Sequence, residues 1–77
     1  MPEYIVTYIK GMQGFGEETK NMGTVNAFCA MDAIRKVTDV SGWTERDHGD
    51  TAALLNPEAA NKGEDYCDYY FAELAEQ

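Results

Sequence analysis

The amino-acid sequence predicts an α+β domain in which an antiparallel sheet of about four strands packs one face against a main helix. Residues 3–10 and 66–74 are rich in aromatic and β-branched side chains, as strands are. Between them, the apolar period of residues 24–43 changes from two residues to three or four, which indicates a strand that runs into an amphipathic helix. The expected order is β-β-α-β-β, in a single small domain that spans residues 1–77.

The first strand is expected at residues 3–10, where apolar side chains point to both faces. This pattern is typical of a central strand, either covered on both sides or covered on one side and aromatic on the other. The glycine-rich stretch 11–21 then predicts a hairpin loop. Its glycine spacing does not match a phosphate-binding loop, and Glu17 and Glu18 would repel phosphate.

The second strand is expected at residues 24–29 and the main helix at residues 31–41. One apolar stripe of this helix is expected to face the core, and it comprises Ala30, Ala33, Ile34, Val37 and Val40. Asp32 lies where a carboxylate can accept a free backbone N–H at the helix start. Gly42 is placed to end the helix in a left-handed conformation.

Residues 44–50 have the composition of a polar loop, and residues 51–55 that of a short strand. The loop contains the cluster that best resembles a metal site, formed by Glu45, Asp47, His48 and Asp50. Its spacing does not fit a calcium-binding loop, and one histidine with scattered carboxylates is a weak ligand set. No nucleophile accompanies His48. We therefore expect no metal, no cofactor and no enzymatic activity.

A short extra helix is expected near residues 57–62, because Asn56 can cap it and Pro57 suits its first position. Residues 66–74 favour a final strand. The alternative for this stretch is a helix capped by Asp65.

The charge is unevenly distributed along the chain. Fourteen acidic and six basic residues give a net charge of −8. Residues 1–38 contain four of each sign, whereas residues 39–77 contain ten acidic and two basic residues and thus account for the whole −8. Phosphate contacts need clustered lysine and arginine, so we expect no direct binding of nucleic acid. An acidic half favours a basic partner instead.

The start of the sequence, Met1-Pro2-Glu3, lacks the positive charge of a signal peptide, and the apolar run that follows is too short to cross a membrane. The two cysteines are far apart and do not form a metal-type pair. We therefore expect a cytoplasmic protein with reduced thiols.

In size and acidity, the chain resembles the small phage-encoded inhibitors of bacterial immunity of the anti-CRISPR type. These proteins share no motif, so the resemblance rests on general character across the whole chain. It implies inhibition by binding, in which acidic side chains occupy a basic surface that normally holds nucleic acid.

These observations together predict a non-enzymatic, protein-binding inhibitor whose partner is a basic protein or a nucleoprotein complex. Carboxylates would supply charge, and tyrosines would supply contact area at low entropy cost. The predicted contact residues are Glu64, Asp65, Tyr66, Asp68 and Tyr69, with Asp47 and Asp50 from the preceding loop. The alternative is a structural or assembly protein that forms a homodimer or larger oligomer through an exposed sheet edge.

Overall fold

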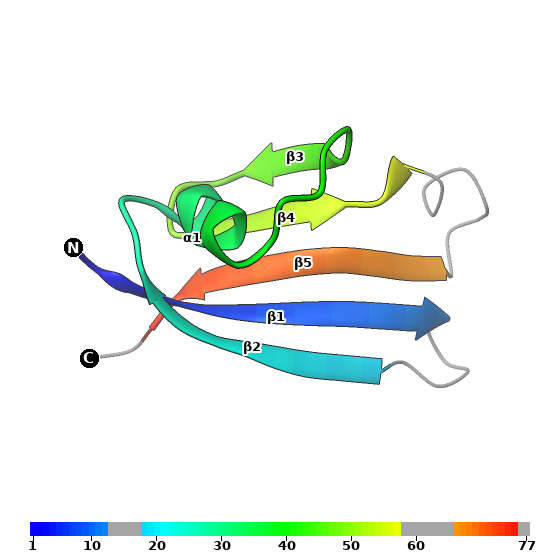
Figure 1. Cartoon of the computed structure of the whole chain (residues 1–77), viewed down its shortest axis with the longest axis horizontal. Coiled ribbons are helices and arrows are strands. Elements are labelled where there is room, and N and C mark those ends of the chain that lie inside the picture. Colours follow the sequence, from blue (N-terminus) through cyan, green and yellow to red (C-terminus); the bar gives the residue numbers. More distant parts are fainter. Residues whose placement is uncertain (13–17, 58–65, 76–77) are drawn as a thin grey trace.

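The computed structural model describes residues 1–12, 18–57 and 66–75, and it describes only the backbone of Met12, Tyr66 and Cys67. Within these ranges, five strands form one antiparallel sheet and one helix packs on it (Figure 1). The elements are β1 (Glu3–Met12), β2 (Glu18–Asn26), α1 (Ala30–Val37), β3 (Thr44–Asp47), β4 (Thr51–Leu55) and β5 (Tyr66–Leu74). The α+β class is confirmed, with five strands in place of about four.

The strand that comes last along the chain lies in the middle of the sheet, whose spatial order is β2-β1-β5-β4-β3. β5 pairs with β1 along its whole length, from Leu74 opposite Tyr4 to Tyr66 opposite Met12. On its other side β5 pairs with β4. The strand expected at residues 66–74 is therefore confirmed, and the alternative helix is wrong.

The core lies between α1 and one face of the sheet. Its buried side chains are Ala30, Met31, Ala33 and Ile34 on the helix, Tyr4, Val6, Ala52, Leu54 and Ala72 on the strands, and Ala27 before the helix. Ile34, Leu54 and Val6 are the largest side chains that are fully buried. The predicted helix stripe is confirmed, because its first three members are buried and Val37 and Val40 pack against the same core.

The helix ends at Val37, four residues before its predicted end. Thr38 is extended, and its N–H donates to the carbonyl oxygen of Ile34 at 3.0 Å, which closes the last turn. Three of the four residues in Val37–Val40 are β-branched, and such residues disfavour helix continuation. Gly42 is left-handed, with φ of 80°, but it turns the chain towards β3 instead of ending the helix.

Residues 44–47 form β3, where the sequence predicted a polar loop. An edge strand needs backbone partners on one side alone, and β4 supplies them, so exposed polar side chains are no obstacle. The following turn is stabilised by Asp47, whose Oδ1 accepts the N–H of Gly49 at 2.9 Å. Of the extra helix expected near residues 57–62, only Pro57 belongs to the described residues.

The second face of the sheet is opposite α1, and no other described element covers it. Its central side chains are half-buried among their own neighbours, and we call this surface the open face. On the three central strands it consists of Ile5, Thr7 and Ile9 on β1, Thr51, Ala53 and Leu55 on β4, and Tyr69, Phe71 and Glu73 on β5. β1 is therefore a central strand. The helix covers one of its faces, and aromatic side chains of β5 lie beside the other.

Candidate protein-binding surface

One end of the sheet joins the start of β1, the β2–α1 connection, the β3–β4 turn and the end of β5 (Figure 1). Four backbone hydrogen bonds hold these segments together: Ala27 N–H to Pro2 O at 3.1 Å, Ala30 N–H to Gly49 O at 3.3 Å, Leu74 N–H to Asp50 O at 3.0 Å, and Ala75 N–H to Glu3 O at 2.8 Å. We call this surface the acidic end, and it comprises Glu3, Phe28, Asp47, Asp50, Glu73 and Leu74.

All four carboxylates of the acidic end are exposed. In the part of the chain that the structure describes, the ion pairs are Arg35 with Glu45 and Lys36 with Asp32. Neither pair includes a carboxylate of the acidic end, so this surface keeps its negative charge.

Apolar side chains are exposed at the same end. Phe28 is 79% exposed and Leu74 is 43% exposed. Single exposed leucines are common on protein surfaces, but a phenylalanine with most of its ring in water is unusual. The acidic end thus combines negative charge with apolar area.

The backbone beneath Phe28 is fixed by the start of α1. The N–H of Phe28 donates to Oδ2 of Asp32 at 3.1 Å, and Lys36 Nζ lies 3.8 Å from the same oxygen. Asp32 therefore satisfies a free N–H as predicted, although the donor precedes the helix. This contact fixes the backbone from which the exposed ring projects, and such order lowers the entropic cost of binding.

Tyr4 lies under the acidic end and is only 4% exposed. Burial raises the pKa of its hydroxyl group, and the negative charges of Asp50, Cys29 as thiolate, and Asp47 raise it further. The two carboxylates of the β3–β4 turn therefore act on the hydroxyl group of one largely buried tyrosine.

Asp68 and Tyr69 lie towards the other end of β5. The carboxylate of Asp68 is half-buried and accepts the hydroxyl of Tyr8 at 2.6 Å and the side-chain amide of Asn56 at 2.7 Å. It therefore links β5 to β1 and to the end of β4. Tyr69 follows it in the strand and belongs to the open face, so the two side chains point to opposite sides of the sheet.

The structure thus divides the predicted contact residues. Asp47 and Asp50 come together at the acidic end, whereas Asp68 is about six strand residues, or roughly 20 Å, away from Leu74. The backbone of Tyr66 lies still farther along β5. Glu64 and Asp65 lie outside the described residues.

Sequence reasoning missed Glu3, Phe28, Glu73 and Leu74 as members of one surface. Phe28 alone carried a local signal, since it falls on the side of its predicted strand that otherwise presents Thr24 and Asn26. The other three come together only through strand pairing between distant parts of the chain.

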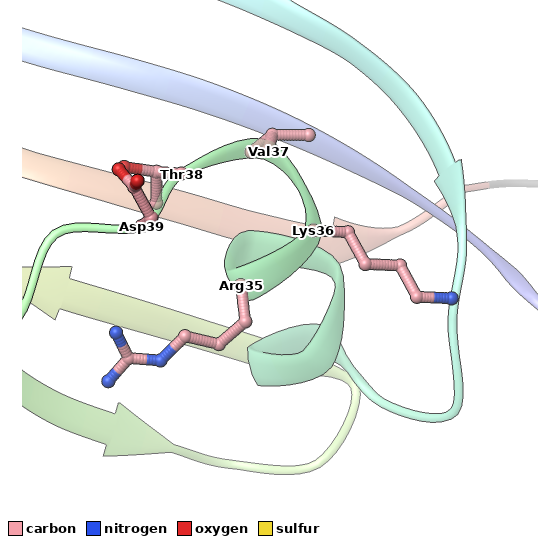
Figure 2. A pocket seen from close by; sticks show the side chains of 5 residues that line it. All are labelled: Arg35, Lys36, Val37, Thr38 and Asp39. Carbon is pink, nitrogen blue, oxygen red and sulfur yellow. The ribbon is translucent and has the colours of Figure 1, made fainter.

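A shallow depression at the end of α1 is a weaker candidate. It is lined by Arg35, Lys36, Val37, Thr38 and Asp39. Figure 2 shows the two basic side chains pointing to opposite sides of the helix. Arg35 reaches the carbonyl oxygen of Val40 and the carboxylate of Glu45, while Lys36 Nζ donates to Asn26 O at 2.8 Å. Both cations bind groups of the protein itself, so they do not converge on an anion site.

Within residues 1–12, 18–57 and 66–75, no group of three or more histidine, cysteine or acidic side chains is arranged to hold a metal ion. The carboxylates of the acidic end are therefore spread over a surface and do not form a cage. No described helix has the length and apolar character needed to span a membrane.

The alternative function, an oligomer formed through a sheet edge, depends on the two edge strands, β2 and β3. In β2, Gly23 lies opposite Val6 and Asn21 opposite Thr7, so Met22 is an extra residue in a β-bulge. Bulges twist an edge away from further pairing. The other edge, β3, has only four residues, all exposed. Neither edge favours extension of the sheet by another chain.

Comparison with models of protein families, with curated protein sequences and with solved structures finds no match for this chain. A function must therefore be inferred from the surfaces described above.

Proposed function

We propose that this chain is a non-enzymatic binding protein whose acidic end docks on a basic, partly apolar surface of another protein. The observation that carries this proposal is Phe28, an exposed aromatic ring on a fixed backbone, at the end of the sheet that also carries four exposed carboxylates.

Each part of this surface has a separate role in binding. Phe28 and Leu74 supply apolar area that a partner can remove from water, and a buried aromatic anchor is typical of binding hot spots. Asp47, Asp50 and Glu73 steer a positively charged partner towards the surface and reject acidic ones. Because steering acts at long range through solvent, salt should weaken it.

The biological consequence proposed is inhibition. A protein that binds nucleic acid presents lysine and arginine side chains where phosphates normally sit. The carboxylates of the acidic end would occupy those side chains and so compete with nucleic acid, in the manner implied by the resemblance to anti-CRISPR inhibitors. In this proposal Asp68 stabilises the fold, while Glu64, Asp65 and Tyr66 remain contact residues predicted from the sequence. Such a partner would place the protein in the cytoplasm.

The test compares two double variants of equal net charge. Asp47→Lys with Asp50→Lys alters the acidic end, and Glu18→Lys with Asp39→Lys alters exposed carboxylates elsewhere. Each exchange adds two charges, so both variants change from −8 to −4. Each immobilised protein is incubated with nuclease-treated bacterial lysate, and retained proteins are identified by mass spectrometry at low and high salt.

We expect the wild type and the second variant to retain the same basic protein, and the first variant to lose it. Added duplex DNA or RNA should release that protein from the wild type. Phe28→Ala, with the charge unchanged, should weaken retention as well. Equal retention by both double variants would exclude the acidic end, and equal loss would show that net charge alone is responsible. Circular dichroism establishes that each variant is folded.

A further inference from the structure

The open face has the arrangement of a protein interface. Strand pairing places Ile9, Tyr69 and Leu55 in one row across three strands, and Phe71 and Ala53 in the next row. Thr7 completes the second row, and the two rows form a largely apolar centre without a charged residue. Glu73 lies in the row beyond it, between Ile5 and Thr51. Polar side chains flank it on the outer strands, with Thr19 and Asn21 on β2, and Thr44 and Arg46 on β3. An apolar centre with a polar rim is typical of protein interfaces.

This composition is unusual for a face in water. Antiparallel sheets with one solvated face normally place polar residues on it, and apolar residues then line the core alone. Here β1, β4 and β5 carry large apolar residues on both faces. The helix buries one set, and the described residues provide no second layer for the other.

We propose that the open face of one copy packs against the open face of a second copy, giving a homodimer with two stacked sheets. Two sheets stack about 10 Å apart with interdigitated side chains. Five strands of four to ten residues each, at a spacing of about 4.8 Å, give a footprint on the order of 500 Å² per copy. Side-chain relief adds to this area, which brings the pair to the lower range of stable interfaces.

Charge favours a second copy over a basic partner at this surface. The central rows offer no carboxylate to a cation, whereas Glu3 and Glu73 lie at one end of the face. A two-fold axis perpendicular to the strands would place the acidic ends of the two copies at opposite ends of the dimer. The molecule is 37 Å long, and this separation exceeds the distance over which charges act at physiological salt, about 8 Å. Asp47 points to the helix side of the sheet and would remain accessible, whereas Glu73 would lie at the border of the interface.

The test is the molar mass in solution, measured by sedimentation equilibrium from about 5 µM to about 500 µM, a range in which interfaces of this size associate. We expect the mass to rise from 8.6 kDa towards twice that value. Because each copy has a charge of −8, added salt should strengthen the dimer. Salt should weaken binding to a basic partner, so the two interactions are separable.

Ile9→Thr with Phe71→Thr places a residue of high strand propensity at both positions and removes apolar area from the face. We expect the dissociation constant to increase at least about tenfold, with an unchanged circular dichroism spectrum. The double variant Asp47→Lys with Asp50→Lys is the control, and it should dimerise at least as tightly as the wild type. A mass of 8.6 kDa at every concentration would overturn the proposal, as would a dimer that the Thr variants leave intact.

Discussion

β1 places Tyr4 and Val6 on the helix side of the sheet, and Ile5 and Ile9 on the open face. The residue types on the two sides are similar, yet Val6 has no exposed surface whereas Ile5 and Ile9 are only partly buried. The difference arises from α1, which supplies Ile34 and its neighbours to one side only. Apolar character therefore makes a strand central, and the position of the helix decides which of its faces becomes the core. Substitutions on the helix side and on the open face should therefore differ in their cost to stability. Dilute protein, in which the proposed dimer dissociates, is used to measure this cost.

The largest expected effect comes from a charge placed in the helix–sheet core. Ile34→Asp would bury a carboxylate without a partner, which should cost about 4 kcal/mol or more. The total stability of a domain of this size is about 4 to 12 kcal/mol, so the variant should be largely unfolded. Ile9→Asp on the open face keeps contact with water and should cost about 1 kcal/mol. Urea denaturation followed by circular dichroism measures both. Similar losses would show that both faces are buried in the monomer.

An intermediate effect is expected from two adjacent leucines that differ in the face they occupy. Leu54 is fully buried against the helix, whereas Leu55 is half-buried on the open face. Leu54→Ala should lower the free energy of unfolding by about 2 to 5 kcal/mol, because it leaves a cavity. Leu55→Ala should cost about 1 kcal/mol, since solvent can fill the space. A larger loss for Leu55→Ala in urea denaturation would contradict the assignment of the two faces.

The smallest effect concerns the hydroxyl group of Tyr4 on the helix side of β1. Its pKa is raised above the ordinary value near 10, so an unfolded chain releases this proton before the folded one does. The contribution to stability is therefore complete below about pH 10 and is lost as the pH rises through the higher pKa of the folded state. As the pH rises from 9 to about 11, the free energy of unfolding should fall less in the Tyr4→Phe variant than in the wild type. Urea denaturation of both proteins at several pH values checks this. Equal slopes of the free energy of unfolding against pH in the two proteins would show that the hydroxyl titrates as it does in water.

Several elements of the fold could be predicted because their signals are local. The apolar stripe through Ala33 and Ile34 follows from the spacing of apolar side chains. The strand at residues 66–74 was favoured by its density of aromatic residues, although spacing alone also allowed a helix. The strand at residues 44–47 could not be found this way, because an edge strand is held by its backbone and its side chains carry no periodic signal. The sequence signal that was available there is the turn formed by Asp47 and Gly49.

The candidate site shows the same limit. Asp47 and Asp50 were predicted as contact residues because acidic residues concentrate in the second half of the chain. Their association with Glu3 and Leu74 depends on the insertion of β5 between β1 and β4, which is a non-local pairing. Asp68 looked equivalent to them by charge, but its hydrogen bonds to Tyr8 and Asn56 make it part of the fold.

The central position of β5 also affects how this chain can fold during its synthesis. Until residues 66–74 have left the ribosome, the β1–β2 hairpin and the β3–β4 hairpin have no strand to join them. Isolated hairpins are only marginally stable in water, and each would expose two unpaired edges, one of them on β1 or β4, which carry apolar side chains on both faces. The sheet is therefore completed only after translation of β5, and a nascent chain stalled before it would be prone to aggregation and a substrate for chaperones.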